Sequence, residues 1–473
     1  MAESTVSIDG ENGRQIYMPD ELMRFIQRDT YSLLIKGFAG TGKTTLALTI
    51  LRALESKNNF FYISTRVSPK QLFQYYPWLA KFVEQPKPEN PGEAPDPTLM
   101  PSFEDARLDE PESLFERITN QLMDIKSPVI IIDSWDAIAS FMDKEARLNN
   151  ERVLQTWRER AGAKLIFISE HPEDTTLDFL VDGIVELKQN HYRSVKVREI
   201  SMLKLRGVRI ERSSYIYTLD NSIFRSFSPY RPVKFKPGPR KKISSDGIAT
   251  AEHVRSGYPV LDSSLGGGFP RKGVVLLELD THVNTSVAMA FLERMVSNFV
   301  SAGNPVLFQP FDWMDPHAIM NYLEPSMPAG KKDLFKILWM GKVSGMSGNI
   351  ISPDKKQQAD PSIAALVKMK QKHSGKLLLN IMGTDIMQRL YGQKGVRSGM
   401  ENLMSDMRTS ADLSIVVISH SQRDVLEYLS EVSDMHLHFL MINDTLFLQS
   451  LVPASTLYSV VFDGHQINLE PVV

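Results

Sequence analysis

Short apolar runs flanked by polar residues recur along the whole chain. They include Tyr31–Lys36 (YSLLIK), residues 129–132, residues 163–168, residues 274–277 and residues 413–420. Nearly continuous apolar runs of this length are typical of parallel strands that are buried on both faces. No run approaches the ~18 apolar residues of a membrane-spanning helix. The pattern therefore predicts an α/β protein with mainly parallel central sheets flanked by helices.

Two stretches interrupt this pattern. Residues 85–111 are rich in proline, glutamate and aspartate and are predicted to form a surface loop. Residues 224–242 (FRSFSPYRPVKFKPGPRKK) combine seven basic residues with four prolines and contain no acid. Helices do not continue through such proline spacing. We therefore expect a basic, proline-rich linker at 224–250 between a first domain at 1–223 and a second domain at 251–473.

The basic residues of the linker leave two interpretations open. They are Arg225, Arg231, Lys234, Lys236, Arg240, Lys241 and Lys242. In one interpretation the linker is an extended tether on an acidic neighbouring surface. In the other it binds the phosphate backbone of a nucleic acid, because basic and aromatic residues alternate in it.

Composition narrows the class of protein further. The 473 residues and 53.5 kDa suffice for two large domains, and 42% hydrophobic with 23% charged residues is ordinary globular usage. A net charge of -2 gives no overall attraction to nucleic acid or anionic lipid. The absence of cysteine excludes disulfides, thiolate metal sites and a cysteine nucleophile. Residues 1–15 lack the apolar core of a secretory signal. We expect a cytoplasmic protein without membrane insertion.

A phosphate-binding loop follows the run Tyr31–Lys36 directly. The pattern G-x-x-x-x-G-K-T lies between this predicted strand and an amphipathic helical run, LALTILRAL, which is the context that the motif requires. Its backbone N–H groups are expected to bind a polyphosphate, and Lys43 to pair with the β- and γ-phosphates. Thr44 would offer its hydroxyl to Mg²⁺. The predicted cofactors are ATP and Mg²⁺, held by Gly37, Phe38, Ala39, Gly40, Thr41, Gly42, Lys43, Thr44 and Thr45.

Two other predicted strands end in polar residues. Asp133 closes the run 127–133 (SPVIIID), and we expect it to hold Mg²⁺ through water. An aspartate at a strand end is often only a helix cap, but the upstream phosphate loop favours the magnesium role. The strand at 163–168 is followed by Ser169, Glu170 and His171 at the sheet edge where α/β proteins bind ligands. This segment is expected to sense the γ-phosphate, unless His171 merely begins the next loop.

The order of these segments resembles the RecA-like ATPase core, particularly its KaiC-like branch. The resemblance covers about residues 31–219 and includes FYIST, PVIIIDSWDAI, KLIFISE, LDFLVDGIVEL and LKLRGVRI. It implies a homo-oligomer, either a ring or a dimer. Lys204 and Arg206 match the K-x-R-G element of this branch, which implies that they reach the neighbouring subunit's nucleotide and assist catalysis. The alternative is that they belong to a basic surface strand.

One position departs from the pattern of the family. KaiC-like and RecA-like ATPases carry a glutamate just beyond the second strand to orient the attacking water, whereas this chain has Arg66 and Val67 there. Loss of a positioned general base costs about 10² to 10⁴-fold in rate. We therefore expect slow hydrolysis or simple ATP sensing, at most a weak ATPase activity. Glu170 is the candidate replacement for the base.

The second half begins with a segment that resembles the start of another KaiC-like domain, but it lacks the residues that bind phosphate. Residues 256–275 (SGYPVLDSSLGGGFPRKGVV) carry this resemblance. With an offset of 241 residues, Glu278 stands opposite Gly37 and Asn284 opposite Lys43. Without glycines and lysine a loop cannot hold phosphate. We expect a degenerate second domain from a tandem duplication.

Three further features of the second half carry weaker signals. Asn380 is expected at the position of the missing magnesium acid. His420 is expected to be a satisfied histidine at a strand end. His436 and His438 alternate on a strand-like run, which is weak evidence for a metal.

The continuation ISTRVSPKQLF, together with the missing base, resembles the archaeal gas-vesicle regulatory GvpD group. This implies an ATP-binding regulator whose nucleotide state controls assembly or the binding of a partner protein, such as a transcriptional regulator. A different function stays open, namely an active oligomeric ATPase of the RecA/KaiC class, for which DNA is one candidate substrate.

Overall fold

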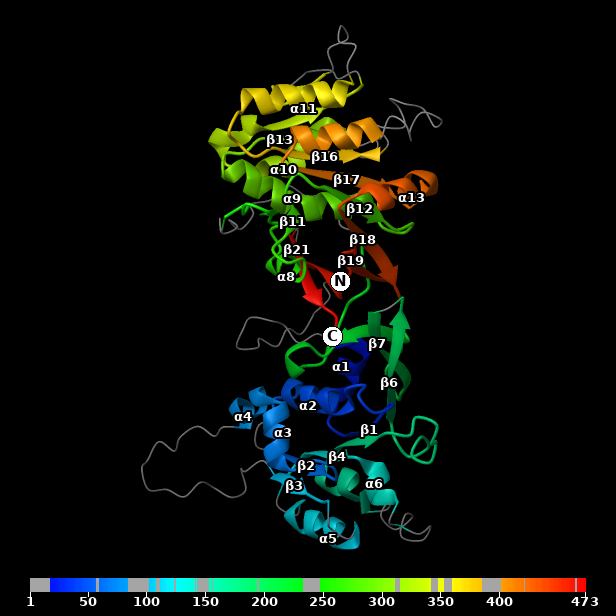
Figure 1. Ribbon diagram of the computed structural model, residues 1–473. Helices are drawn as coiled ribbons and strands as arrows, with labels where there is room; N and C mark the ends of the chain where they lie inside the picture. Colours follow the sequence, from blue (N-terminus) through cyan, green and yellow to red (C-terminus); the bar gives the residue numbers. More distant parts are fainter. Residues whose placement is uncertain are drawn as a thin grey trace, which may run out of the picture. The chain divides into compact units, whose positions relative to one another are not determined.

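The chain divides into two compact units, which are shown in Figure 1. The structure is a computed structural model. It describes residues 18–473 apart from 57–58, 84–101, 108–110, 123–124, 141, 143–152, 155, 194, 233–246, 311–314, 342–347, 353–359, 385–400, 421 and 464–465. The first unit extends to Ser228 and includes Val472–Val473, and the second unit is Pro229–Pro471. Each unit is described here by itself.

The first unit is built on a nine-stranded sheet with the order β3-β2-β4-β5-β1-β6-β7-β8-β9. Its strands are β1 (Tyr31–Lys36), β2 (Phe60–Ser64), β3 (Ser102–Asp105), β4 (Val129–Asp133), β5 (Lys164–Ser169), β6 (Gly183–Tyr192), β7 (Val195–Leu205), β8 (Ser214–Thr218) and β9 (Arg225–Ser226). Its helices are α1 (Asp20–Ile26), α2 (Lys43–Ala53), α3 (Pro69–Tyr75), α4 (Pro77–Val83), α5 (Pro111–Leu122), α6 (Trp135–Ala139) and the 3₁₀ turn η2 (Asp220–Ser222).

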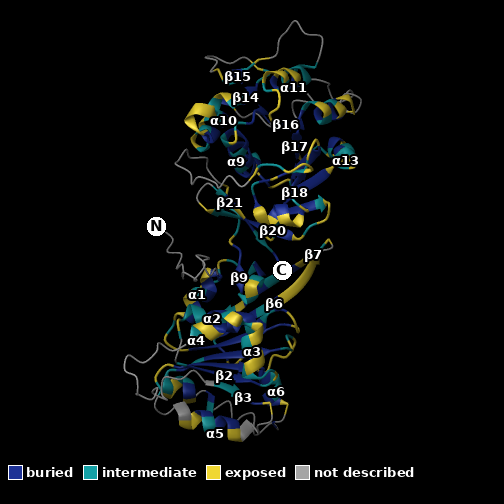
Figure 2. Ribbon diagram, turned by 60° about the vertical axis from the view of Figure 1, so that its left-hand side comes forward, coloured by how far each residue is buried: buried dark blue, intermediate teal, exposed yellow. Residues whose placement is uncertain are grey.

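Six neighbouring strands of this sheet, from β3 to β6, run parallel, and β7 to β9 continue it antiparallel. Every residue of β1 is buried, as expected where helices cover both faces of a parallel sheet. Alternate residues of β1 enter two different cores. Leu33 and Ile35 pack with α1 to α4, whereas Leu34 packs with α5 and α6. Figure 2 shows buried strands around β2 and exposed residues on α3 and α5.

The second unit contains a ten-stranded sheet and a small two-stranded sheet. Its strands are β10 (His253–Val254), β11 (Phe269–Pro270), β12 (Val274–Leu279), β13 (Val306–Gln309), β14 (Phe335–Leu338), β15 (Ile350–Ile351), β16 (Leu379–Gly383), β17 (Leu413–Ser419), β18 (Met435–Ile442), β19 (Thr445–Val452), β20 (Leu457–Asp463) and β21 (Gln466–Pro471). Its helices are α8 (Pro259–Ser264), α9 (Thr285–Ser301), α10 (Pro316–Leu323), η3 (Glu324–Ser326), η4 (Ala329–Leu334), α11 (Pro361–Lys372) and α13 (Arg423–Val432).

The two large sheets repeat one connectivity. The second has the order β15-β14-β13-β16-β17-β12-β18-β19-β20-β21, with parallel strands up to β18 and antiparallel strands beyond it. If β15 is set aside, each strand takes the place of one strand of the first sheet, with β12 at the place of β1. Helix α9 packs on one face of this sheet, and α11 and α13 pack on the other. The predicted fold class, two mainly parallel sheets flanked by helices, is confirmed.

Two segments differ from the sequence-based expectation. Arg225–Ser226 forms β9 of the first sheet and Phe224 is buried, so the first unit continues to Ser228 beyond the expected boundary at residue 223. The prediction of a loop at 85–111 is wrong for Ser102–Asp105, which pairs with β2 as the edge strand β3. Residues 84–101 of that segment lie outside the described residues. In the described part of the chain, no helix is long and apolar enough to cross a membrane.

Candidate nucleotide-binding site

Residues 37–42 connect the end of β1 to the start of α2 and form the phosphate loop. Gly42 precedes α2 with φ of +91°, and a Cβ at this position would lie 2.6 Å from Leu219 Cδ1. The positive φ therefore favours glycine, and the Leu219 side chain would also have to shift to make room for a Cβ. Phe38, near the tip of the loop, is 66% exposed. The loop presents its backbone at the surface before the 11-residue helix α2, whose N-terminal N–H groups favour an anion.

Lys43 is the first residue of α2, and its side chain lies against the loop. Its Nζ donates to the carbonyl oxygens of Gly37 at 2.7 Å and Phe38 at 3.0 Å. Burial lowers the pKa of Lys43, while the charges of Glu170 and Asp133 act in the opposite direction. A phosphate at the loop would supply this ammonium group with the opposite charge that the neutral carbonyls do not.

Thr44 and Asp133 meet at the position expected for a magnesium site. Thr44 Oγ1 donates to Asp133 Oδ2 at 2.6 Å, and Asp133 is buried at the end of β4. Hydroxyl and carboxylate oxygens are ligands that Mg²⁺ accepts, usually together with phosphate oxygens and water. Among the described residues, no group of three histidine or acidic side chains is arranged to hold a metal by itself. The Thr44 hydroxyl and the Asp133 carboxylate therefore fit an ion that a nucleotide would also coordinate.

Two tyrosines support the loop, and the sequence analysis missed both. Thr45 Oγ1 lies 3.0 Å from the hydroxyl of Tyr76, which follows α3. The Tyr217 hydroxyl, on β8, donates to the Thr41 carbonyl oxygen at 2.5 Å. Both tyrosines are distant from the loop in sequence, so only the packing of α3 and β8 near the loop reveals their role.

Glu170 follows β5, and its carboxylate forms an ion pair with Arg66. The Arg66 side chain is 53% exposed and that of Glu170 is 21% exposed. The charge of the Glu170 carboxylate raises the pKa of Lys43, whose side chain lies against the phosphate loop. We expected the glutamate of KaiC-like ATPases just beyond β2, and Arg66 lies there. The candidate base Glu170 is paired with this cation.

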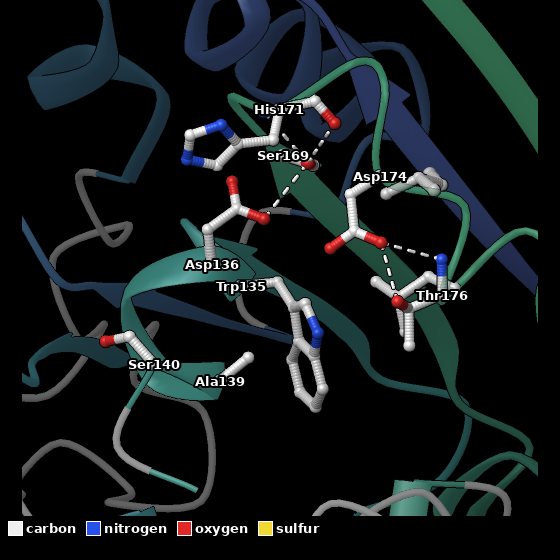
Figure 3. A pocket seen from close by; sticks show the side chains of 10 residues that line it. Trp135, Asp136, Ala139, Ser140, Ser169, His171, Asp174 and Thr176 are labelled. Carbon is white, nitrogen blue, oxygen red and sulfur yellow. Dashed lines mark hydrogen bonds between the residues drawn. The ribbon is translucent and has the colours of Figure 1, made fainter.

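A pocket of about 220 Å³ lies beside this segment (Figure 3). Its lining includes Trp135, Asp136, Ser169 and His171, and no residue of the phosphate loop is among the described residues that line it. Asp136 accepts hydrogen bonds from Ser169 Oγ at 3.0 Å and from the Glu170 backbone N–H at 2.5 Å. Asp136 therefore fixes the segment after β5. Ser169 and His171 line this pocket, whereas the charge of Glu170 raises the pKa of Lys43.

Lys204 and Arg206 both contact their own chain. Lys204 Nζ donates to the carbonyl oxygens of Asp178 at 2.8 Å and Val181 at 2.7 Å. Arg206 pairs with Asp182 at 3.3 Å, and its side chain is 56% exposed. Burial, followed by the charge of Arg206, lowers the pKa of Lys204. Their action on a neighbouring subunit stays a prediction, which requires them to exchange these contacts for phosphate.

The second unit has no phosphate loop at the corresponding place. Residues 280–284 connect β12 to α9 and contain neither glycine nor lysine. Asn284 caps α9, and its Oδ1 accepts a hydrogen bond from the Ser286 N–H at 2.9 Å. An ordinary helix cap therefore stands where the first unit has Gly42 and Lys43.

Glu278 lies on β12 among three histidines, which the sequence analysis did not bring together. Its carboxylate is 2.8 Å from His420 Nδ1, 2.9 Å from His436 Nε2 and 3.5 Å from His438 Nε2. His420 follows β17, and the other two lie on β18; these strands flank β12 in the sheet. Burial alone would raise the pKa of Glu278, but hydrogen bonds and charges from His436, His438 and His420 lower it to about 2.

Replacing Glu278 by glutamine is expected to change the acid stability of the protein. The pKa is depressed from 4.5 to about 2, so ionised Glu278 contributes roughly 3 kcal/mol above pH 4.5, which is lost as the pH falls toward 2. Urea unfolding should show Glu278→Gln to be less stable than wild type at pH 6, with a smaller loss of stability between pH 4.5 and 2.5. Glu427→Gln, at an exposed position, is the control. Equal acid sensitivity of all three proteins would contradict the assignment.

Two expectations about other site residues need correction. Asn380 is the second residue of β16 and is fully buried, with hydrogen bonds to Gln309 at 3.2 Å and Ser414 at 3.3 Å. It therefore lies inside the strand and not at the carboxyl end, where a magnesium ligand belongs. Arg225 is buried in β9 and is not part of an exposed basic linker. The linker residues from Lys234 to Lys242 lie outside the described residues.

The fold and the phosphate loop define a P-loop protein. Residues 22–204 match the family model described as GvpD gas vesicle protein, P-loop domain. GvpD2 of Halobacterium salinarum is 26% identical over 298 residues, which are 60% of this chain and 59% of the relative. GvpD1 of the same organism is 27% identical over 305 residues, 60% and 55% of the two chains. The circadian clock oscillator protein KaiC of Parathermosynechococcus lividus is 24% identical over 276 residues, 55% and 48%.

These matches confirm the resemblance to KaiC-like P-loop proteins of the RecA superfamily and to the GvpD group. The chain spans about half the length of the curated relatives that it matches.

Proposed function

We propose that this chain is an ATP-binding regulatory protein that hydrolyses ATP slowly or not at all. One observation supports this most strongly. Lys43 and the Thr44–Asp133 pair lie beside the phosphate loop, whereas the carboxylate of Glu170 is paired with Arg66. Binding and catalysis depend on different side chains. In this proposal the side chains that bind nucleotide are in place, whereas the carboxylate that would act as general base is held by Arg66.

In this proposal the first unit binds one Mg²⁺·ATP. Backbone N–H groups of 37–42 and Lys43 bind the phosphates, and Thr44 with Asp133 holds the ion. The ion neutralises phosphate charge. Asn284 and the glycine-free connection 280–284 offer no phosphate loop at the place that corresponds to residues 37–42. The second unit then acts as scaffold or docking surface.

Nucleotide binding would change the surface beside the site. Lys43 is a cation whose carbonyl partners the phosphates can replace, and half-exposed Arg66 is attracted by the same charge. Glu170 stays paired with Arg66 and would move with it. The Glu170 N–H is bonded to Asp136, which lines the 220 Å³ pocket, so the change would reach that surface. This is the route by which nucleotide state would control assembly or partner binding.

We further propose that the partner is a protein such as a transcriptional regulator and that both act in the cytoplasm. The name of the matched family refers to gas vesicles, so proteins that regulate gas-vesicle formation are the first partners to test. A second candidate function is an active oligomeric ATPase. Half-exposed Arg206 beside Lys204 favours it, and it would require both residues to leave their present contacts.

The regulatory proposal is tested by measuring the mass of the purified protein by light scattering without nucleotide, with Mg²⁺·ADP and with Mg²⁺·ATP. We expect a change of oligomer, or of complex with an added candidate partner, that depends on ATP and that does not decay over an hour. A change that reverses within minutes as ADP accumulates would support the oligomeric ATPase instead. Equal masses and partner binding in all three states would contradict nucleotide control.

A further inference from the structure

Asp133 is held by a second donor besides Thr44. The Tyr62 hydroxyl donates to Asp133 Oδ2 at 2.6 Å, the same oxygen that Thr44 Oγ1 contacts at 2.6 Å. Tyr62 lies on β2, the strand next to β4, and is 1% exposed. One carboxylate oxygen is thus fixed from two elements, α2 and β2.

The Tyr62 phenol is a neutral hydrogen-bond donor to the Asp133 carboxylate. A hydrogen bond from a neutral donor to a carboxylate is stronger than one between neutral groups. Because Tyr62 is packed inside the sheet, its hydroxyl also stays in one place.

The end of β2 holds the main chain of Asp133 as well. The Thr65 N–H donates to the Asp133 carbonyl oxygen at 2.8 Å, and Thr65 Oγ1 accepts a hydrogen bond from the Ser134 N–H at 2.9 Å. Thr65 directly precedes Arg66, which pairs with Glu170. Side chain and backbone of Asp133 are therefore both fixed by the strand that leads to Arg66.

We propose that Tyr62 is the positioning residue of the magnesium site, which orients the Asp133 carboxylate toward Thr44. This inference rests on the proposed Mg²⁺·ATP binding. Mg²⁺ demands near-ideal octahedral geometry, so a carboxylate that is oriented in advance loses little freedom when the ion binds. Without the phenol, Asp133 Oδ2 keeps Thr44 as its remaining described donor, and the carboxylate can rotate away.

The test compares Tyr62→Phe with Tyr258→Phe, because Tyr258 is a buried tyrosine of the second unit whose hydroxyl donates to the Phe291 carbonyl oxygen at 3.1 Å. The dissociation constant of a non-hydrolysable ATP analogue is measured by calorimetry with 5 mM Mg²⁺ and with EDTA. The dissociation constant with EDTA divided by the constant with Mg²⁺ gives the gain in affinity that is due to the ion. We expect Tyr62→Phe to reduce this ratio about tenfold, which corresponds to the loss of one hydrogen bond to a charged group. Tyr258→Phe should leave it unchanged.

The outcomes separate this inference from the proposed function. If wild type binds no nucleotide, the proposed function itself fails. If wild type shows a magnesium-dependent gain that Tyr62→Phe retains or increases, the positioning role is wrong while ATP binding stands. A loss of equal size with Mg²⁺ and with EDTA would show that Tyr62 only supports the fold, and would also overturn the inference. Thermal unfolding of each variant without nucleotide confirms that it is folded.

Discussion

Replacing Lys43 by alanine is expected to weaken the binding of Mg²⁺·ATP at least about 100-fold. The change removes the ammonium group that lies 2.7 Å from the Gly37 carbonyl oxygen, within the loop that would hold the phosphates. Two charge-assisted hydrogen bonds to phosphate, each worth about 1.5–3 kcal/mol, account for a loss of this size. Calorimetry with a non-hydrolysable ATP analogue measures it directly.

The matched control for this variant lies in the second unit. Asn284 stands opposite Lys43 at an offset of 241 residues and caps α9. Asn284→Ala should leave the affinity for nucleotide unchanged, although it is expected to cost about 1 kcal/mol of stability through the lost cap. A large loss of affinity in Asn284→Ala, or unaltered affinity in Lys43→Ala, would place the nucleotide elsewhere.

The second large effect is expected on hydrolysis. Arg66→Ala should raise the single-turnover rate, by up to about 10²-fold, because it frees the Glu170 carboxylate to act as a general base. The double variant Arg66→Ala/Glu170→Gln should return to the slow rate of wild type. Rates are measured with enzyme in excess over radiolabelled ATP.

Glu170→Gln alone distinguishes the two functions that stay open. If Arg66 sequesters Glu170, as the ion pair indicates, this variant should hydrolyse ATP as slowly as wild type. Clear turnover in wild type that Glu170→Gln abolishes would mean that Glu170 already serves as the base. The chain would then be a working ATPase.

The phosphate loop and the fold class were predictable because their signals are local. The strand Tyr31–Lys36, the glycines and Lys43 are contiguous, and fully apolar strands indicate a parallel sheet covered on both faces. The short edge strand Ser102–Asp105 was missed because its sequence, SFED, has almost no apolar signal. β9 was missed for a similar reason, since two residues within a basic, proline-rich stretch carry no strand pattern.

The contacts between residues that are distant in sequence depend on the order of the strands in the sheets. This order cannot be read from the sequence. Tyr62 reaches Asp133 because β2 lies next to β4. Glu278 meets the histidines because β12 lies between β17 and β18, although His420 and His436 stand far from it along the chain. The pairing of Arg66 with Glu170 likewise joins the segments after β2 and β5. Of these contacts, only the last could be suspected from the sequence, because Arg66 stands where a glutamate was expected.

The most direct test of a single, slowly hydrolysing ATP site is to count the bound nucleotide and identify it. The purified protein is incubated with excess Mg²⁺·ATP, freed of unbound nucleotide, and denatured after different times for chromatography. We predict one nucleotide per chain, recovered as ATP after tens of minutes. Recovery mainly as ADP within the first minute, or of two nucleotides per chain, would contradict the account.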